Sequence, residues 1–177
     1  EGVTGIAAGT RRSGEDAPWR SSFAGSLAGP GSPDVSSTTL FDLASITKLL
    51  VTTVILRLQE LGELRLEDRV GPHLKRGRKK EVPAADATFE DLLRHRSGLP
   101  AVSDAWRLYG AQDPEAVRAH LIGAPLESAL GREHRYSCVG FALVGFAAER
   151  AVNVPLSQLV WDLVAKPLGA TTLGYRP

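Results

Sequence analysis

Hydrophobic and polar positions divide the chain into a short strand-like beginning and a longer helical remainder. Residues 3 to 10 and 19 to 27 are rich in small and β-compatible side chains, and the polar run R-R-S-G-E-D-A-P separates them. This pattern predicts a β-hairpin. The glycines and prolines of residues 28 to 39 interrupt both helix and strand, so that segment is expected to be a loop.

The helical remainder opens with a long apolar run. Between Ser45 and Leu58 nearly every residue is apolar or threonine, and Gly62 supplies a natural C-terminal stop. The run predicts a mostly buried helix from Ser45 to Leu61. We therefore expect a strand pair and its loop at residues 1–40, followed by a helical lobe at residues 41–177.

Helix-capping signals place the other helices of this lobe. The sequence T-F-E-D at 88–91 has the form of a capping box and predicts a short helix that ends at Gly98. The sequence D-P-E at 113–115 predicts a helix that runs to about Ile122. Two further helices are predicted at residues 139–152 and 156–165, separated by Asn153 and Pro155.

Composition gives no sign of a nucleic-acid or membrane partner. Twenty-one basic and 20 acidic residues nearly balance, and 43% of the residues are hydrophobic, which is typical of a globular protein without a strong field for nucleic acid or anionic lipid. The basic residues between Lys75 and Lys80 lack interleaved aromatics and are interpreted as a solvated loop, so no nucleic-acid partner is expected. The longest apolar candidate, residues 49–56, falls short of the ~20 residues of a membrane span.

The cellular compartment of the protein is not assigned by its cysteine content or by its first residue. The single cysteine, Cys138, excludes an intrachain disulfide framework. The sequence begins at Glu1 rather than methionine, which leaves room for a leader removed earlier.

Ser45 and Lys48 form a candidate catalytic pair within the stretch F-D-L-A-S-I-T-K. Residues three apart share one helix face, so the lysine amine can reach the serine hydroxyl. A serine at a helix N-terminus also has a free backbone amide for a developing oxyanion, while the apolar surroundings of Lys48 are expected to lower its pKa and make it a base. The alternative is an N-cap serine with a lysine that extends to solvent.

Several segments together resemble the penicillin-recognising serine enzymes, which comprise class C β-lactamases, D-alanyl-D-alanine carboxypeptidases and their esterase and transacylase relatives. The segments follow one another in family order and cover the chain from about residue 40 onward: F-D-L-A-S-I-T-K-L-L-V-T-T at 41–53, L-G-E-L-R-L-E-D-R-V at 61–70, D-L-L-R-H-R-S-G-L-P at 91–100, Y-S-C-V-G-F-A-L-V-G at 136–145 and K-P-L-G-A-T-T-L-G at 166–174. The resemblance implies an α+β fold of the β-lactamase/penicillin-binding type, with antiparallel sheet strands and a helical lobe.

The resemblance also implies roles for individual residues. Ser45 matches the acylated nucleophile, Lys48 the residue that helps to deprotonate it, and Tyr136 the tyrosine that relays a proton between nucleophile and leaving group. A tyrosine can do this only if a cation lowers its pKa from ~10, and Lys48 is the nearest candidate. Taken by itself, Tyr136 is interpreted as an amphipathic core residue at the start of a helix.

Cys138 departs from the family pattern. It stands where the family has an asparagine, or an aspartate in esterase-like members, that contacts lysine and substrate. One weak S–H donor replaces two donors and an acceptor, which argues against tight recognition of a substrate amide. Cys138 is assigned to substrate binding, although a second nucleophile, a metal ligand or simply a small buried residue are alternatives.

A second departure is that the family's later sheet strands, with their K-T-G or H-x-G box, have no counterpart in this sequence. A second chain or a further segment is therefore expected to complete the site. No cofactor or metal is implied, because His73, His95, His120 and His134 show no ligand spacing, and His95 matches a structural histidine of the family.

The expected function is that of a serine hydrolase or acyltransferase that forms an acyl-enzyme on Ser45, with a small-molecule acyl donor and acceptor and with ester or amide substrates. One alternative is a true β-lactamase or D-alanyl-D-alanine carboxypeptidase. Another is a non-catalytic binding protein that kept the fold.

Overall fold

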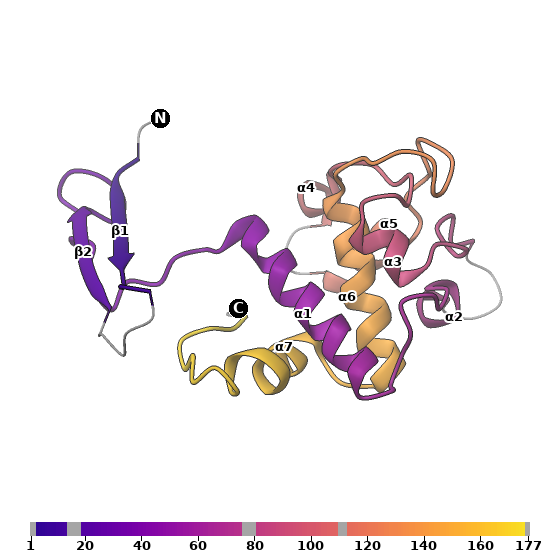
Figure 1. The fold of residues 1–177 in the computed structure, drawn as a ribbon. Coiled ribbons are helices and arrows are strands. Elements are labelled where there is room, and N and C mark those ends of the chain that lie inside the picture. Colours follow the sequence, from indigo (N-terminus) through magenta and orange to yellow (C-terminus); the bar gives the residue numbers. More distant parts are fainter. Residues whose placement is uncertain (1–2, 14–18, 76–80, 110–112, 176–177) are drawn as a thin grey trace. The chain divides into compact units, whose positions relative to one another are not determined.

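The chain forms two compact units, Glu1–Leu43 and Ala44–Pro177 (Figure 1). The computed structural model describes residues 3–13, 19–75, 81–109 and 113–175. Arg76, Arg78, Lys79 and Lys80, which belong to the basic loop singled out in the sequence, lie outside the described residues.

The first unit contains the β-hairpin that the sequence predicts. Strands β1 (Gly5–Thr10) and β2 (Arg20–Gly25) pair antiparallel, in a register that sets Gly5 opposite Gly25 and Thr10 opposite Arg20. Gly25 has φ +79°, and a Cβ there would lie 2.1 Å from the Thr4 carbonyl oxygen, so only glycine fits. Both strands are largely exposed, and the buried apolar side chain that follows them is Val35.

The second unit begins with a 3₁₀ turn, η1 (Ala44–Ile46), that leads into helix α1 (Thr47–Glu60). The helix ends at Glu60, one residue before the predicted Leu61, and the expected stop, Gly62, follows with φ +76°. The amide of Glu63 donates to the Leu58 carbonyl and the amide of Gly62 to that of Gln59, which is the pattern of a Schellman motif.

The prediction that this helix is mostly buried is wrong, because only four of the 14 residues of α1 are buried and its apolar side chains lie on two faces. Val51, Val54, Ile55 and Leu58 are buried in the core. On the other face an exposed ridge, consisting of Ile46, Leu49 and Leu56, points away from that core, with 67% of Leu49 accessible.

Helix α3 (Phe89–Leu93) begins with the predicted capping box, because Thr88 and Asp91 each accept the other's backbone N–H. The prediction that this helix ends at Gly98 is wrong, since it ends at Leu93. The reason is that His95 adopts a left-handed conformation with φ +55° and turns the chain three residues before Gly98 does. Two short helices that the sequence did not predict are α2 (Gly71–Leu74) and α4 (Ala105–Tyr109).

The remaining helices follow their predicted capping signals closely. Helix α5 (Pro114–Ile122) has Asp113 as its N-cap, whose carboxylate accepts the Ala116 N–H at 2.9 Å. Helix α6 (Cys138–Val152) ends at Asn153, which has φ +54°. After Pro155 come α7 (Leu156–Val160) and a π-helical turn, η2 (Trp161–Ala165).

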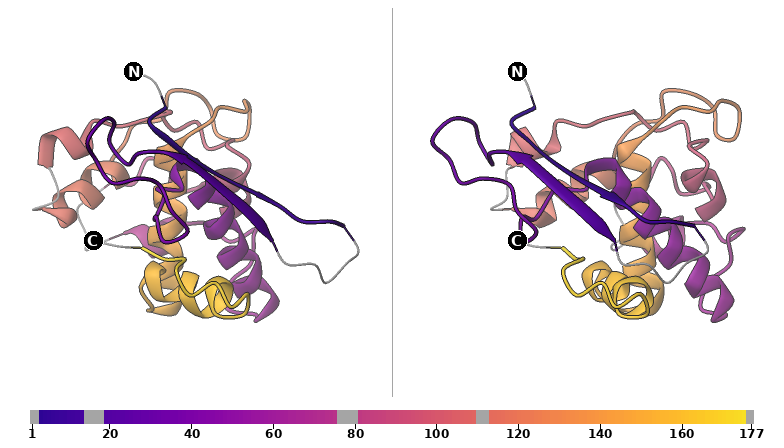
Figure 2. Two further views of the ribbon diagram at one scale, coloured as in Figure 1. Left: turned by 90° about the vertical axis from the view of Figure 1, so that its left-hand side faces the viewer. Right: turned by 60° about the vertical axis from the view of Figure 1, so that its left-hand side comes forward.

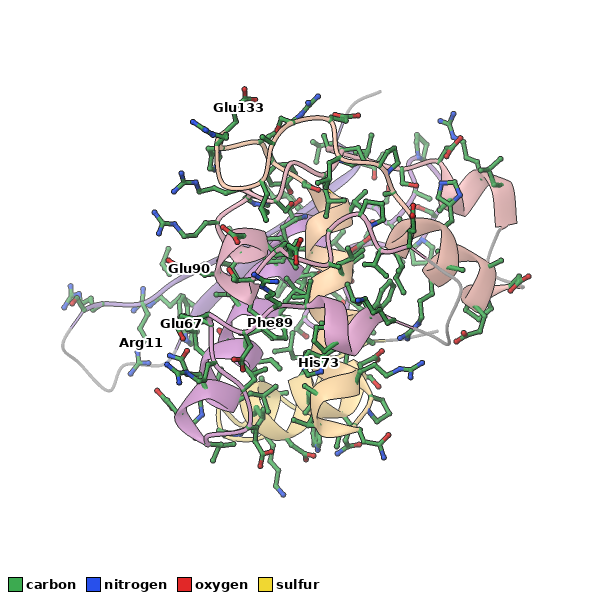
Figure 3. The ribbon with its side chains drawn as sticks, turned by 90° about the vertical axis from the view of Figure 1, so that its right-hand side faces the viewer. Arg11, Glu67, His73, Phe89, Glu90 and Glu133 are labelled. Carbon is green, nitrogen blue, oxygen red and sulfur yellow. The ribbon has the colours of Figure 1, made fainter. Side chains whose placement is uncertain are left out.

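Helix α6 is the central helix of the second unit (Figures 1 and 2). It contacts α1, α2, α3, α5 and α7, and the small residues Gly140, Gly145, Ala147 and Ala148 are buried along it. Phe89 of α3 is fully buried in the same core and lies beside His73 of α2, with ring centroids 6.0 Å apart (Figure 3). Small side chains let the neighbouring helices approach α6 closely. This close packing holds α1, and the segment that precedes α6, in defined positions.

In the part of the chain that the structure describes, no single helix is long and apolar enough to cross a membrane; α6 and the segment Leu156–Ala165 meet that criterion only as a pair bent by 89°.

Candidate functional site

Ser45 lies in the 3₁₀ turn η1 rather than at the first position of α1. The residue before it, Ala44, has φ +43°, a conformation that costs a residue with a Cβ about 1 kcal/mol or more. The Ser45 side chain is exposed at the end of the helix. A sharp turn immediately before an exposed hydroxyl is a geometry suited to a nucleophile.

The shortest side-chain contact of Ser45 is with Tyr136. Its Oγ lies 2.7 Å from the Tyr136 hydroxyl oxygen, and either atom can donate. The Lys48 ammonium donates to the same Oγ at 3.4 Å. The serine oxygen therefore lies within hydrogen-bonding distance of a phenol and an amine.

Lys48 joins the site to Cys138. Its Nζ lies 3.4 Å from the Cys138 Sγ and 4.8 Å from the centroid of the Tyr136 ring. The Phe141 ring, on the first turn of α6, lies 5.8 Å from the same Nζ. The structure thus brings together all four residues singled out from the sequence: Ser45, Lys48, Tyr136 and Cys138.

The expectation that the surroundings of Lys48 lower its pKa is wrong. Burial does lower the pKa, but hydrogen bonds to the Tyr136 and Cys138 side chains and the charges of those two groups outweigh it, so the pKa is raised above 10.5. The apolar flanks are visible in the local sequence, whereas both partners come from a segment about 90 residues away. Lys48 is therefore an ammonium ion at neutral pH.

Cys138 is exposed, which corrects the alternative that it is a small buried residue. Its backbone is well held, because the Cys138 N–H donates to the Ala101 carbonyl at 2.7 Å. The preceding residue, Ser137, is the N-cap of α6: its Oγ accepts the Gly140 N–H at 2.9 Å and donates to the Pro100 carbonyl at 2.6 Å. Ser137 is buried, so it acts as an anchor for the two exposed side chains on either side of it.

His95 belongs to the site although the sequence suggested only a structural role. Its ring lies 4.7 Å from the Tyr136 ring and 5.0 Å from the Phe141 ring, measured between centroids. Burial, together with electrostatic repulsion from His134 and Lys48, lowers the pKa of His95 below 6.5. The sequence feature that could have indicated this place for His95 is the segment H-R-S-G at 95–98, in which a turn follows a capped helix.

Among the described residues, no group of three or more His, Cys, Asp or Glu side chains converges in a way that could hold a metal ion. The arrangement of hydroxyl, phenol, amine and thiol is chemically suited to proton transfer and to nucleophilic attack on an acyl group.

Known proteins of one family are similar to this chain along almost its whole length. A protein-family model described as "Beta-lactamase" matches residues 4–177. Esterase EstB of Burkholderia gladioli is 35% identical over 153 residues, which are 77% of this chain and 38% of the esterase. N-acetylmuramyl-L-alanine amidase of Bacillus subtilis strain 168 is 31% identical over 150 residues, 78% of this chain and 34% of the amidase. The chain thus spans little more than a third of the length of these relatives.

A solved structure with the same fold is the β-lactamase/D-alanine carboxypeptidase from Yersinia pestis complexed with citrate. It superimposes with a TM-score of 0.76 at 21% identity, over 99% of this chain and 51% of that one. The similarity identifies the fold as β-lactamase/penicillin-binding-like, and the chain matches about half of it.

Proposed function

The chain belongs to the beta-lactamase family, and on that basis we propose that it carries the nucleophile of a serine hydrolase or acyltransferase that works through an acyl-enzyme on Ser45. The observation that carries the proposal is the 2.7 Å contact between the Ser45 Oγ and the Tyr136 hydroxyl, with the Lys48 ammonium beside both. An alcohol needs such a partner, because it is a weak nucleophile at neutral pH.

In the proposed acylation, Tyr136 in its phenolate form accepts the Ser45 proton. The Oγ forms a bond to the acyl carbon of the donor, and the bond to the leaving alcohol or amine breaks. Tyr136 then returns the proton to the leaving group. Lys48 remains protonated and stabilises negative charge on Tyr136 and on the serine oxygen, in keeping with its raised pKa.

In the second half of the reaction, water or another acceptor attacks the acyl-enzyme and Ser45 recovers its proton. Water gives hydrolysis, whereas an alcohol or amine gives transfer, so the acceptor decides between the two. We infer that polypeptide beyond this chain, either a second chain or a further segment, completes the pocket, because the chain spans 38% and 34% of the relatives named above.

Ester and amide substrates are the favoured class. Two relatives bear the names of an esterase and an amidase, which supports a carbonyl substrate with an oxygen or nitrogen leaving group. The exposed thiol of Cys138, with its weak donor, favours esters over substrates with an amide side chain such as penicillins. A true β-lactamase or D-alanyl-D-alanine carboxypeptidase is the second candidate, and the β-lactamase/carboxypeptidase fold favours it.

Covalent labelling tests this proposal. The intact protein is incubated with p-nitrophenyl acetate, denatured, weighed by mass spectrometry and mapped by peptide digestion. We expect one acetyl group on Ser45 in the wild type and none in Ser45→Ala.

Thr53→Ala is a matched control, because Thr53 is an exposed hydroxyl on the same helix whose Oγ1 donates to the Leu49 carbonyl, and it should label like the wild type. Acetyl groups that persist in Ser45→Ala would refute Ser45 as the nucleophile. A wild type that never labels, even with further activated esters, would favour a non-catalytic binding protein.

A further inference from the structure

We propose that His95 is a positioning residue for Tyr136, holding its backbone and its ring so that the phenol oxygen meets the Ser45 hydroxyl. The inference rests on the proposed function, because it assigns Tyr136 the proton-transfer role. His95 itself lies outside hydrogen-bonding contact with Ser45 in the interactions described above and acts through Tyr136.

The backbone around Tyr136 is fixed from both sides by His95. The Arg135 N–H donates to the His95 carbonyl at 2.7 Å, and the Ser137 N–H donates to the His95 Nδ1 at 3.0 Å. One residue therefore supplies an acceptor to each neighbour of Tyr136. This restrains the Tyr136 backbone, whereas the side chain of Tyr136 is 45% exposed and gains less from surrounding packing.

The ring of His95 completes this support. It lies against the Tyr136 ring at 4.7 Å with a tilt of 39°, and against the Phe141 ring at 5.0 Å with a tilt of 44°. Phe141 is buried and belongs to α6, so the imidazole lies between the fixed core and the exposed phenol. Contact with the core limits the positions that the Tyr136 ring can adopt.

The left-handed backbone at His95 makes this double contact possible. With φ +55°, its carbonyl and its side chain both face the segment from Arg135 to Ser137. Such a conformation is uncommon for residues other than glycine, although histidine, like asparagine and aspartate, adopts it more often than most, and it costs of order 1 kcal/mol. The strain is offset by the contacts that it allows.

The Nδ1 atom can accept the Ser137 N–H only while it carries no proton. Protonation at low pH would place two donors against each other and loosen the segment. The charged or titratable groups that face the imidazole are Lys48 from α1, together with His134 and Tyr136 from the segment before α6; Phe141 of α6 is apolar. Burial, His134 and Lys48 all oppose protonation of His95, so Nδ1 stays available as an acceptor above the lowered pKa.

Two variants of the intact protein separate positioning from folding. His95→Asn keeps a neutral acceptor in the place of Nδ1 and tolerates positive φ, whereas His95→Gly also tolerates positive φ but has no side-chain acceptor. The first readout is the hydrogen-exchange rate of the Ser137 amide, followed by NMR. The second is the rate of acetylation by p-nitrophenyl acetate from pH 5 to pH 8.

In His95→Gly we expect Ser137 exchange to be faster by about 10-fold and acetylation slower by about 10- to 100-fold, since small misplacement of a catalytic group is costly. In His95→Asn the exchange of Ser137 should stay within about 3-fold of the wild type at pH 8, because the acceptor is retained. Its acetylation rate should fall between those of the wild type and His95→Gly, because the ring contact with Tyr136 is lost. In the wild type, protonation of His95 should lower the acetylation rate at low pH. His95→Asn should lack this part of the fall, since an amide does not titrate.

A purely structural role of His95 would change stability but would leave the pH profile of folded His95→Asn like that of the wild type. Unchanged Ser137 exchange and unchanged acetylation in folded His95→Gly would overturn the inference. If the wild type does not label at all, the proposed function fails separately; the positioning of Tyr136 is then decided by amide exchange, and unchanged exchange overturns it.

Discussion

At the scale of single residues, the exposed thiol of Cys138 lies beside Lys48 of the candidate pair. Lys48 lies 3.4 Å from its sulfur, the position from which an amide oxygen would accept a stronger hydrogen bond. The side chain is exposed, so a residue of slightly larger volume fits without disturbing the core. This makes the position suitable for a change of specificity.

Cys138→Asn is expected to raise kcat/KM for substrates with an amide side chain by about 10-fold relative to simple esters, because it supplies two donors and an acceptor. The measurement is the ratio of kcat/KM for a matched amide-bearing ester and its unsubstituted analogue. Cys138→Ser is the control, because it changes sulfur to oxygen without adding an amide. An identical ratio in all three proteins would contradict this interpretation of Cys138.

Stability should also depend on the protonation of His95. Its pKa is lower in the folded protein than its ordinary value of 6.5, so the unfolded chain binds the proton more readily. The stabilisation is therefore complete above pH 6.5 and is lost as pH falls through the folded pKa. Urea unfolding at pH 7.5 and pH 5 should show a larger loss of unfolding free energy in the wild type than in His95→Asn. An equal loss would mean that His95 does not contribute.

At the scale of helices and strands, the end of α6 depends on one left-handed residue. Asn153 has φ +54°, and its N–H donates to the Glu149 carbonyl at the last turn. Asparagine and glycine adopt this conformation readily, whereas alanine does so at a cost of about 1 kcal/mol.

Asn153→Ala should therefore lower the free energy of unfolding by about 1 kcal/mol, while Asn153→Gly should leave it within about 0.5 kcal/mol of the wild type. Chemical denaturation of both variants provides the measurement. Arg150→Ala, an exposed change in the same turn, is the control and should have little effect. If Asn153→Ala and Asn153→Gly are equally stable, backbone conformation does not decide the end of α6.

These examples explain which elements were predictable from the sequence. Helix ends that depend on local chemistry, such as the Thr88 capping box, the Asp113 N-cap and the Gly62 stop, were predicted and are observed. The early end of α3 was missed, because the left-handed backbone of His95 is stabilised by the distant segment around Tyr136. Local capping rules contain no information about such contacts.

The same distinction applies to the candidate site. The spacing of Ser45 and Lys48 already indicated that the amine could reach the hydroxyl, and the two atoms lie 3.4 Å apart. The direction of the Lys48 pKa was predicted wrongly, because Tyr136 and Cys138 are remote in sequence and their hydrogen bonds outweigh local burial. The charge balance around a partly exposed amine such as that of Lys48 depends on the tertiary structure.

At the scale of the whole molecule, helix α1, which carries Lys48 and directly follows the turn with Ser45, is apolar on both sides. The buried side, with Val54 and Ile55, holds α1 in the core. The exposed ridge of Ile46, Leu49 and Leu56 contributes nothing to that core. Ser45 lies next to the end of this ridge at Ile46, so an apolar surface adjoins the candidate nucleophile.

The exposed ridge should influence how molecules of this protein associate in solution. Adjacent exposed aliphatic side chains favour association between molecules, and this association depends on protein concentration and strengthens in sulfate or phosphate buffers. Copies that meet through α1 would shield Ser45 as well as the ridge. Protein concentration and buffer anion therefore become experimental variables, and a weak labelling yield in a concentrated sample is expected to rise on dilution.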